Sequence, residues 1–153
     1  MVKVLQRKSQ GMFVYEGFGF PVALLNVPMV RVRGAWTPDV DFNALSHRLL
    51  QALSRKPARL TGQEIRFIRH SLSMTLELFA HRFGVTHPAV IKWESARNRA
   101  TVMAWAVEKD IRLEALRSSS AVRPSGFLNT YLELKDRPTA RPVRMRLDVM
   151  KAV

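Results

Sequence analysis

The feature that most constrains this chain is a long stretch, residues 61–117, in which little interrupts helix formation. Its only glycines are Gly62 and Gly84, and its only proline is Pro88. Glycine and proline most often break or end helices, and the apolar residues here recur at three- and four-residue spacing. The stretch therefore predicts several helices that bury their apolar faces.

Three helices are predicted from their start and stop signals. Thr61 and Glu64 form a capping box at the first start, because each side chain can satisfy an unpaired backbone amide. Thr75 is placed to cap the second helix, and Gly84 supplies the left-handed residue that ends it. Thr86 is placed to cap the third, which tolerates a proline in its first turn. A short turn thus joins the second and third helices.

The second and third predicted helices have the features of a helix-turn-helix. Ala80 is small where two helices cross, glycine stands in the turn, and Val85 and Val90 fix the angle between the helices. The segment resembles the lambda-repressor-like (Xre) DNA-binding family, whose pattern is matched by Phe79-Ala80, Gly84-Val85-Thr86, Val90 and Trp93-Glu94. The resemblance spans residues 61–117 and implies a helical domain that binds duplex DNA.

In such a domain the third helix enters the major groove and the second crosses the phosphate backbone. Helical spacing turns Val90 and Trp93 inward and leaves the other positions for DNA. The residues that we expect to contact DNA are Thr75, Thr86, His87, Pro88, Ala89, Ile91, Lys92, Ser95, Arg97 and Arg99.

Only part of this set can read bases. Lys92 can donate to guanine O6 and N7, and His87 can read a base edge or touch a phosphate. Ala89 or Ile91 can pack on a thymine methyl group. Leu76 stands where many members of the family carry a polar residue, often glutamine, so one frequent contact is missing. DNA shape and phosphate contacts are therefore expected to carry more of the specificity.

The other members of the set suit the phosphate backbone. Backbone amides near Thr75 and Thr86 point from helix starts, where phosphate oxygens bind well. Arg97 and Arg99 follow the third helix and are expected to contact further phosphates.

The stretch before these helices has a different character. Residues 13–15 and 30–33 favour strands and are separated by glycines and prolines, which predicts a hairpin or meander. A helix with regularly spaced leucines follows, capped by Asp39 or Asp41. Residues 54–59 are basic, polar and broken by proline, which predicts a connection between two modules.

Two further strands are predicted after the helices, at residues 127–134 and 143–149, which together suggest a C-terminal β hairpin. The chain is therefore expected to be an α+β protein. Its parts are an N-terminal β-rich accessory or dimerisation module at 1–60, the helix-turn-helix domain at 61–120 and a C-terminal extension at 121–153.

The N-terminal layout carries a second resemblance. The run from Tyr15 to Gly34 is followed by the leucine-rich helix and then by the helix-turn-helix. This order is similar to that of MqsA-type antitoxins, in which the N-terminal unit is a zinc-binding module of the YgiT type. The present chain has no cysteine, so the zinc ligands of that module are absent and no metal is expected.

Composition narrows the partner class. Twenty-five lysines and arginines against twelve acidic residues give a net charge of +13, which is most easily tolerated beside a polyanion. The chain has no apolar run of membrane-spanning length and no secretory signal, so a cytoplasmic, nucleoid-associated location away from membranes is expected. The lack of cysteine agrees with that compartment.

No pattern in the sequence resembles an active site. Glu108 and Asp110 stand beside a lysine and an arginine, which predicts a solvated, salt-bridged helix face. The four histidines are not paired at i,i+4 spacing, as a zinc site on one helix would require. Met103 and Trp105 are predicted to belong to the core or to a dimer seam.

These observations predict a non-enzymatic transcriptional regulator, a repressor that binds a palindromic operator in double-stranded DNA as a homodimer and without a cofactor. One alternative is an antitoxin of a type II toxin–antitoxin pair, which neutralises a toxin protein and represses its own operon. Residues 1–60 carry nine basic and three acidic residues, which disfavours a basic toxin as partner. The other alternative is a general nucleic-acid binder.

Overall fold

The computed structural model describes residues 4–119, 124–134 and 143–150 and confirms the α+β class. The residues cluster into two compact units, one of residues 1–48 with 144–153 and one of residues 49–143. The elements in chain order are β1 (Arg7–Tyr15), β2 (Val22–Val32), β3 (Ala35–Pro38), α1 (Phe42–Ser54), α2 (Gly62–Ser71), α3 (Leu76–Arg82), α4 (His87–Glu94), α5 (Trp105–Ser118), α6 (Pro124–Glu133) and β4 (Met145–Asp148).

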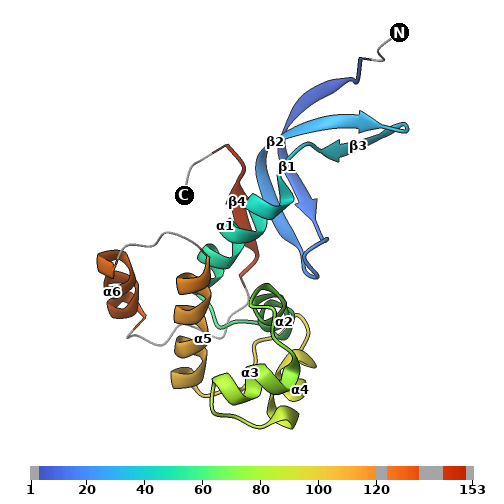
Figure 1. Ribbon diagram of the computed structural model, residues 1–153. Coiled ribbons are helices and arrows are strands. Elements are labelled where there is room, and N and C mark those ends of the chain that lie inside the picture. Colours follow the sequence, from blue (N-terminus) through green and yellow to red (C-terminus); the bar gives the residue numbers. More distant parts are fainter. Residues whose placement is uncertain (1–3, 120–123, 135–142, 151–153) are drawn as a thin grey trace. The chain divides into compact units, whose positions relative to one another are not determined.

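The first unit is built around β2, which pairs along both edges. β1 runs antiparallel along one edge, so the two strands form the predicted hairpin. The other edge is shared between two short strands, since β3 pairs antiparallel with the end of β2 and β4 pairs parallel with its start (Figure 1). β4 comes from the far end of the sequence, so this unit is not continuous along the chain.

The start of β2 is buried on both faces of the sheet, because the consecutive residues Val22, Ala23 and Leu24 are all buried. Val22 and Leu24 of β2 are buried, and their register partners Met145 and Leu147 on β4 are buried with them. Tyr15 of β1 stacks on a ring at the start of α1, with 4.9 Å between the centroids. The start of α1 is fixed by Asp41, because its Oδ1 accepts hydrogen bonds from two backbone amides of the first turn.

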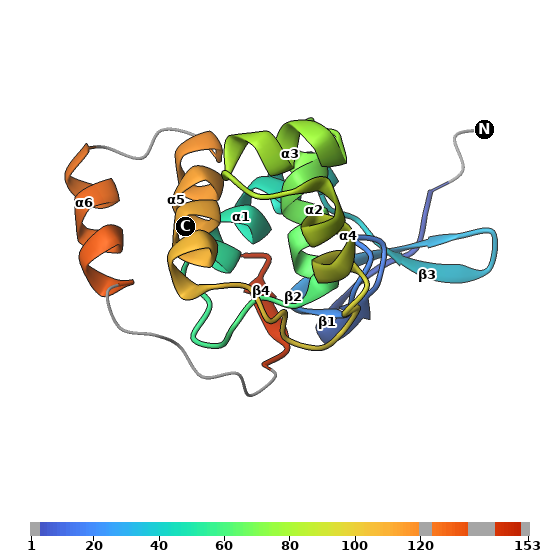
Figure 2. The same ribbon diagram turned by 90° about the horizontal axis from the view of Figure 1, so that it is seen from below.

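The second unit is helical, and its predicted start and stop signals are confirmed. Thr61 and Glu64 form the capping box of α2, and Thr75 and Thr86 cap α3 and α4. α4 lies against both α2 and α3 (Figures 1 and 2). The largest apolar side chains that are fully buried in this unit are Leu49, Leu53, Leu60, Ile65, Ile68, Phe79, Ile111 and Leu116.

The segment at 54–59, which the sequence presents as a polar connection, lies within the helical unit. Lys56 and Arg59 are buried there, at 2% and 7% exposure. None of the helices in the described part of the chain is long and apolar enough to cross a membrane.

The expected strand at 127–134 is wrong, because residues 127–133 belong to α6, which packs beside α5 (Figure 1). Phe127, Leu128, Tyr131 and Leu132 recur at one- and four-residue spacing, which fits a helix better than a strand. The second expected strand exists as β4, but it pairs with β2. The two segments therefore do not form the predicted C-terminal hairpin.

Candidate nucleic-acid interface

The connection between α3 and α4 is tight and internally satisfied. Gly84 has φ +67°, a left-handed conformation that side chains disfavour, and it lets the chain turn after α3. The amide of Val85 donates to the carbonyl oxygen of Ala80 at 2.9 Å. The hydroxyl of Thr86 then accepts a hydrogen bond from the amide of Ala89 and starts α4. The turn thereby fixes the direction in which α4 leaves.

α4 has one buried and one exposed face. Val90 is fully buried and Trp93 is 7% exposed, as helical spacing predicts. Ile91 is 46% exposed, and Lys92 and Ser95 are also exposed. The Ser95 hydroxyl donates back to a backbone carbonyl of α4 at 2.7 Å, so it stays close to the helix. The exposed face therefore presents one cation and one large apolar side chain.

The segment after α4 is held by the start of α2. The amide of Gly62 donates to the carbonyl oxygen of Arg99 at 3.3 Å, and the amide of Gln63 donates to that of Arg97 at 2.9 Å. A Cβ on Gly62 would lie 2.4 Å from the carbonyl oxygen of Trp93, so only glycine allows this approach. The backbone that carries both arginines is therefore fixed by packing against α2.

Glu94, which matches the end of the family pattern, has a structural role. Arg69 of α2 donates to its Oε1 at 2.6 Å and to its Oε2 at 3.2 Å. The same guanidinium donates to the backbone oxygen of Met74 at 3.0 Å. A bidentate pair of this kind fixes the end of α4 relative to α2.

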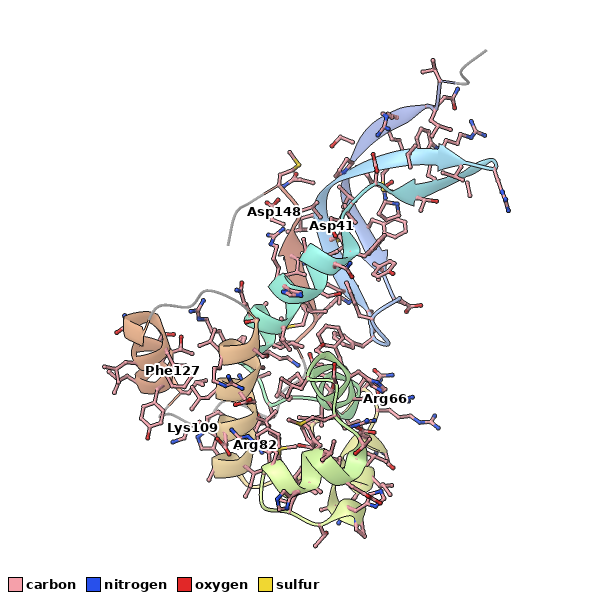
Figure 3. All side chains as sticks on the ribbon, viewed as in Figure 1. Asp41, Arg66, Arg82, Lys109, Phe127 and Asp148 are labelled. Atoms are coloured by element: carbon pink, nitrogen blue, oxygen red, sulfur yellow. The ribbon has the colours of Figure 1, made fainter. Side chains whose placement is uncertain are left out.

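The lysine and the two arginines that were predicted to contact DNA differ from most other described lysines and arginines of the helical unit, because they have no ion-pair partner. In the described residues, no carboxylate lies within ion-pairing distance of Lys92, Arg97 or Arg99. Arg82, by contrast, reaches from α3 toward α5 and lies 2.9 Å from a carboxylate oxygen of Glu114 (Figure 3). Uncompensated charge at the surface is available to an external anion.

The residues at the starts of α3 and α4 are less available than the sequence suggests. The hydroxyls of Thr75 and Thr86 already accept hydrogen bonds from backbone amides. His87 is only 41% exposed in its side chain, and its Nδ1 lies 4.0 Å from Oε1 of Glu77. Glu77 is 82% exposed and would repel a phosphate at the start of α3. Pro88 is exposed and Ala89 is half-buried.

The structure instead brings together three of the predicted residues. Lys92, Ser95 and Arg99 line one hollow of about 330 Å³ beside the end of α4. Arg97 is exposed in a left-handed conformation, with φ +53°. The strongest concentration of unpaired cations among the predicted residues is therefore at the C-terminal end of α4.

Sequence reasoning missed a buried ion network in the same unit. Glu108 is fully buried and accepts from Arg59 Nε at 2.8 Å and from Arg112 Nη2 at 2.8 Å, so a solvated face is wrong for this residue. Arg112 also donates to the backbone oxygens of Lys56 and Ala58, each at 2.6 Å. Burial lowers the pKa of Arg112, and the adjacent Glu108 carboxylate opposes that shift.

This network also accounts for Trp105. The guanidiniums of Arg59 and Arg112 lie over its ring at 5.7 and 5.5 Å from the centroid. Met103 is 4% exposed, and its backbone oxygen accepts from Arg59 at 2.5 Å. Met103 therefore belongs to the core, whereas Trp105 is half-buried. Asp110 is exposed and pairs with Arg82 at 3.7 Å, as the sequence predicts.

Among the described residues, no group of three or more histidine, aspartate or glutamate side chains could hold a metal ion. Comparison of the chain with protein-family models, with curated proteins and with solved structures gives no match.

Proposed function

We propose that this protein is a sequence-specific, duplex-DNA-binding transcriptional regulator in which α3 and α4 act as a helix-turn-helix. The observation that carries the proposal is the exposed face of α4 with the segment that follows it. There Lys92, Arg97 and Arg99 stand without carboxylate partners in the described structure, on a backbone fixed by α2.

The two faces of α4 suit the two tasks of a recognition helix. Burial of Val90 and Trp93 keeps the helix in place, while its exposed side chains are free to enter a groove. An α-helix fits the major groove of B-form DNA, where Lys92 would donate to guanine and Ile91 would pack on a thymine methyl. Arg97 and Arg99 would contact phosphates and set the register of the helix.

We further propose that the regulator acts as a homodimeric repressor on a two-fold-related operator. One α4 offers few groups that can read bases, so a single copy would recognise only a short sequence. Two copies bound to half-sites about one helical turn apart would double the number of base contacts.

Selection from a random duplex pool tests this function. A regulator of this kind is expected to enrich one motif, with affinity at least about 10³-fold above random duplex. Footprinting on the protein's own upstream region should show two protected half-sites about one helical turn apart. If the pool yields no motif, or single-stranded RNA competes as well as the best duplex, the protein is a general nucleic-acid binder and the proposal is wrong.

A further inference from the structure

The hollow at the end of α4 contains polar groups that the fold leaves unused. Lys92, near the end of α4, and Arg99, in the segment after it, both line the hollow, and both are exposed. Thr101 lines it too and is 5% exposed. None of its lining residues in the described part of the chain is acidic. The hollow therefore concentrates positive charge without a compensating carboxylate.

Thr101 gives the clearest sign that something binds there. Its Oγ1 is buried and has no hydrogen-bond partner among the described residues. A buried hydroxyl without a partner is costly, and most such groups in folded proteins are satisfied. Its backbone is firmly placed, because its amide donates to the carbonyl oxygen of Leu60 at 3.1 Å. Thr101, whose hydroxyl has no partner in the described structure, is thus a fixed part of the wall of the hollow.

The donors define the chemistry of that group. An ammonium, a guanidinium and a hydroxyl can all donate, and the first two cannot accept. A ligand with several acceptor oxygens and negative charge satisfies all three at once, which describes a phosphate. The hollow is also larger than a phosphate, and Ala96 and Val102 give it an apolar wall. That wall suits the sugar of a phosphate ester.

We propose that Lys92, Arg99 and Thr101 form a phosphate-binding site in this hollow. The phosphate has two chemical sources, a backbone phosphate of duplex DNA and the phosphate of a free mononucleotide. The first source rests on the proposed function, whereas the second does not. Under the first, Arg99 and Thr101 anchor the end of α4 to the DNA backbone while Lys92 reaches guanine; under the second, all three side chains bind the small molecule.

Titration with inorganic phosphate tests the site directly. Backbone amide signals followed by NMR at constant ionic strength, with chloride as the matched salt, should shift saturably at Thr101 and its neighbours. Thr101→Ser keeps the hydroxyl and should bind like the parent, whereas Thr101→Val should bind about tenfold more weakly. Arg99→Gln should lose binding, and Arg33→Gln, which removes the same charge from the exposed turn between β2 and β3, should not.

Two further measurements distinguish a DNA backbone phosphate from the phosphate of a free mononucleotide as the ligand. Thr101→Val and Arg99→Gln should weaken duplex binding about tenfold if the backbone phosphate is bound. Adenosine 5′-monophosphate should bind more tightly than inorganic phosphate, and adenosine should not bind, if the free ester is the ligand. Thermal melting checks that each variant is folded, and Arg99→Gln provides the test if the valine variant is not.

The proposal is overturned if phosphate and the mononucleotide give no saturable shifts and Thr101→Val binds duplex like the parent. Failure of the motif selection leaves these titrations unaffected, so the site and the regulator function fail separately. If Arg33→Gln weakens phosphate binding as much as Arg99→Gln does, the binding is a diffuse charge effect. That result would also overturn the proposal.

Discussion

Two groups of cations in the helical unit show opposite uses of positive charge. Around α2 and α5, Lys56, Arg59 and Arg112 are buried and paired with carboxylates or backbone oxygens. At the end of α4, Lys92 and Arg99 are exposed and have no such partner in the described residues. The comparison teaches that net charge alone does not locate a binding surface, because part of that charge holds the fold together.

The largest effect is expected from Glu108→Gln, which leaves Arg59 and Arg112 buried beside a neutral side chain. Breaking a buried ion pair by removing one partner typically costs about 3–5 kcal/mol, because the remaining charge is uncompensated. Urea denaturation measures the loss in the free energy of unfolding. Asp110→Asn, two residues away on the same helix, breaks only an exposed pair and should cost less than about 0.5 kcal/mol. Equal losses in the two variants would contradict the comparison.

A second variant, Gly62→Ala, disturbs the support of the unpaired arginines. Its Cβ would lie 2.4 Å from the backbone oxygen of Trp93 and 2.8 Å from the backbone nitrogen of Arg97, so backbone must move. We expect a loss of about 1–3 kcal/mol in thermal or urea unfolding. Gly11→Ala is the control, because nothing lies within 4 Å of its added Cβ. A stable Gly62 variant would show that α2 does not fix this segment.

Changes to the unpaired cations should affect binding and leave the fold intact. Lys92→Ala should lower operator affinity and relax preference at one base pair by about 1–3 kcal/mol. Arg99→Ala should weaken all duplexes alike and reduce the slope of log affinity against log salt by about 1. Fluorescence anisotropy at several salt concentrations measures both. If Lys92→Ala bound and discriminated like the parent, α4 would not be the recognition helix.

The smallest effect concerns Glu114, whose partners Arg82 and Arg117 are paired but exposed. Hydrogen bonds from Arg117 and Arg82, with Arg117 contributing most, lower the pKa of Glu114 from its usual 4.5. The folded state therefore binds this proton less readily than the unfolded state, so the contribution to stability is present above pH 4.5 and is lost as the pH falls through the lowered pKa.

Unfolding of the parent and of Glu114→Gln, measured between pH 7 and pH 3, tests this assignment. The parent should be the more stable protein near neutrality, and the difference should shrink as the solution becomes acidic. Solvent screening of the arginines keeps the effect small. A difference that stays constant across this range would show that the carboxylate charge does not contribute.

Local signals predicted much of the helical unit. The caps at Thr61, Thr75 and Thr86 and the left-handed Gly84 depend on neighbouring residues, so the sequence alone indicates them. The burial of Glu108 depends on Arg59, which lies far away along the chain, and no local pattern carries that information. The candidate site is also only partly predictable. The sequence predicts Lys92 and Arg99 near DNA, but no local pattern indicates that the Thr101 hydroxyl is buried without a partner.

The pairing of β4 with β2 constrains when the sheet of this protein can be completed during synthesis. Its partner residues on β2, Val22 to Leu25, leave the ribosome before any helix, while β4 is made after all six described helices. Until then that edge of β2 lacks its partner, and an uncovered apolar strand edge readily pairs with other chains. We therefore expect nascent chains interrupted after α5 to aggregate through this edge.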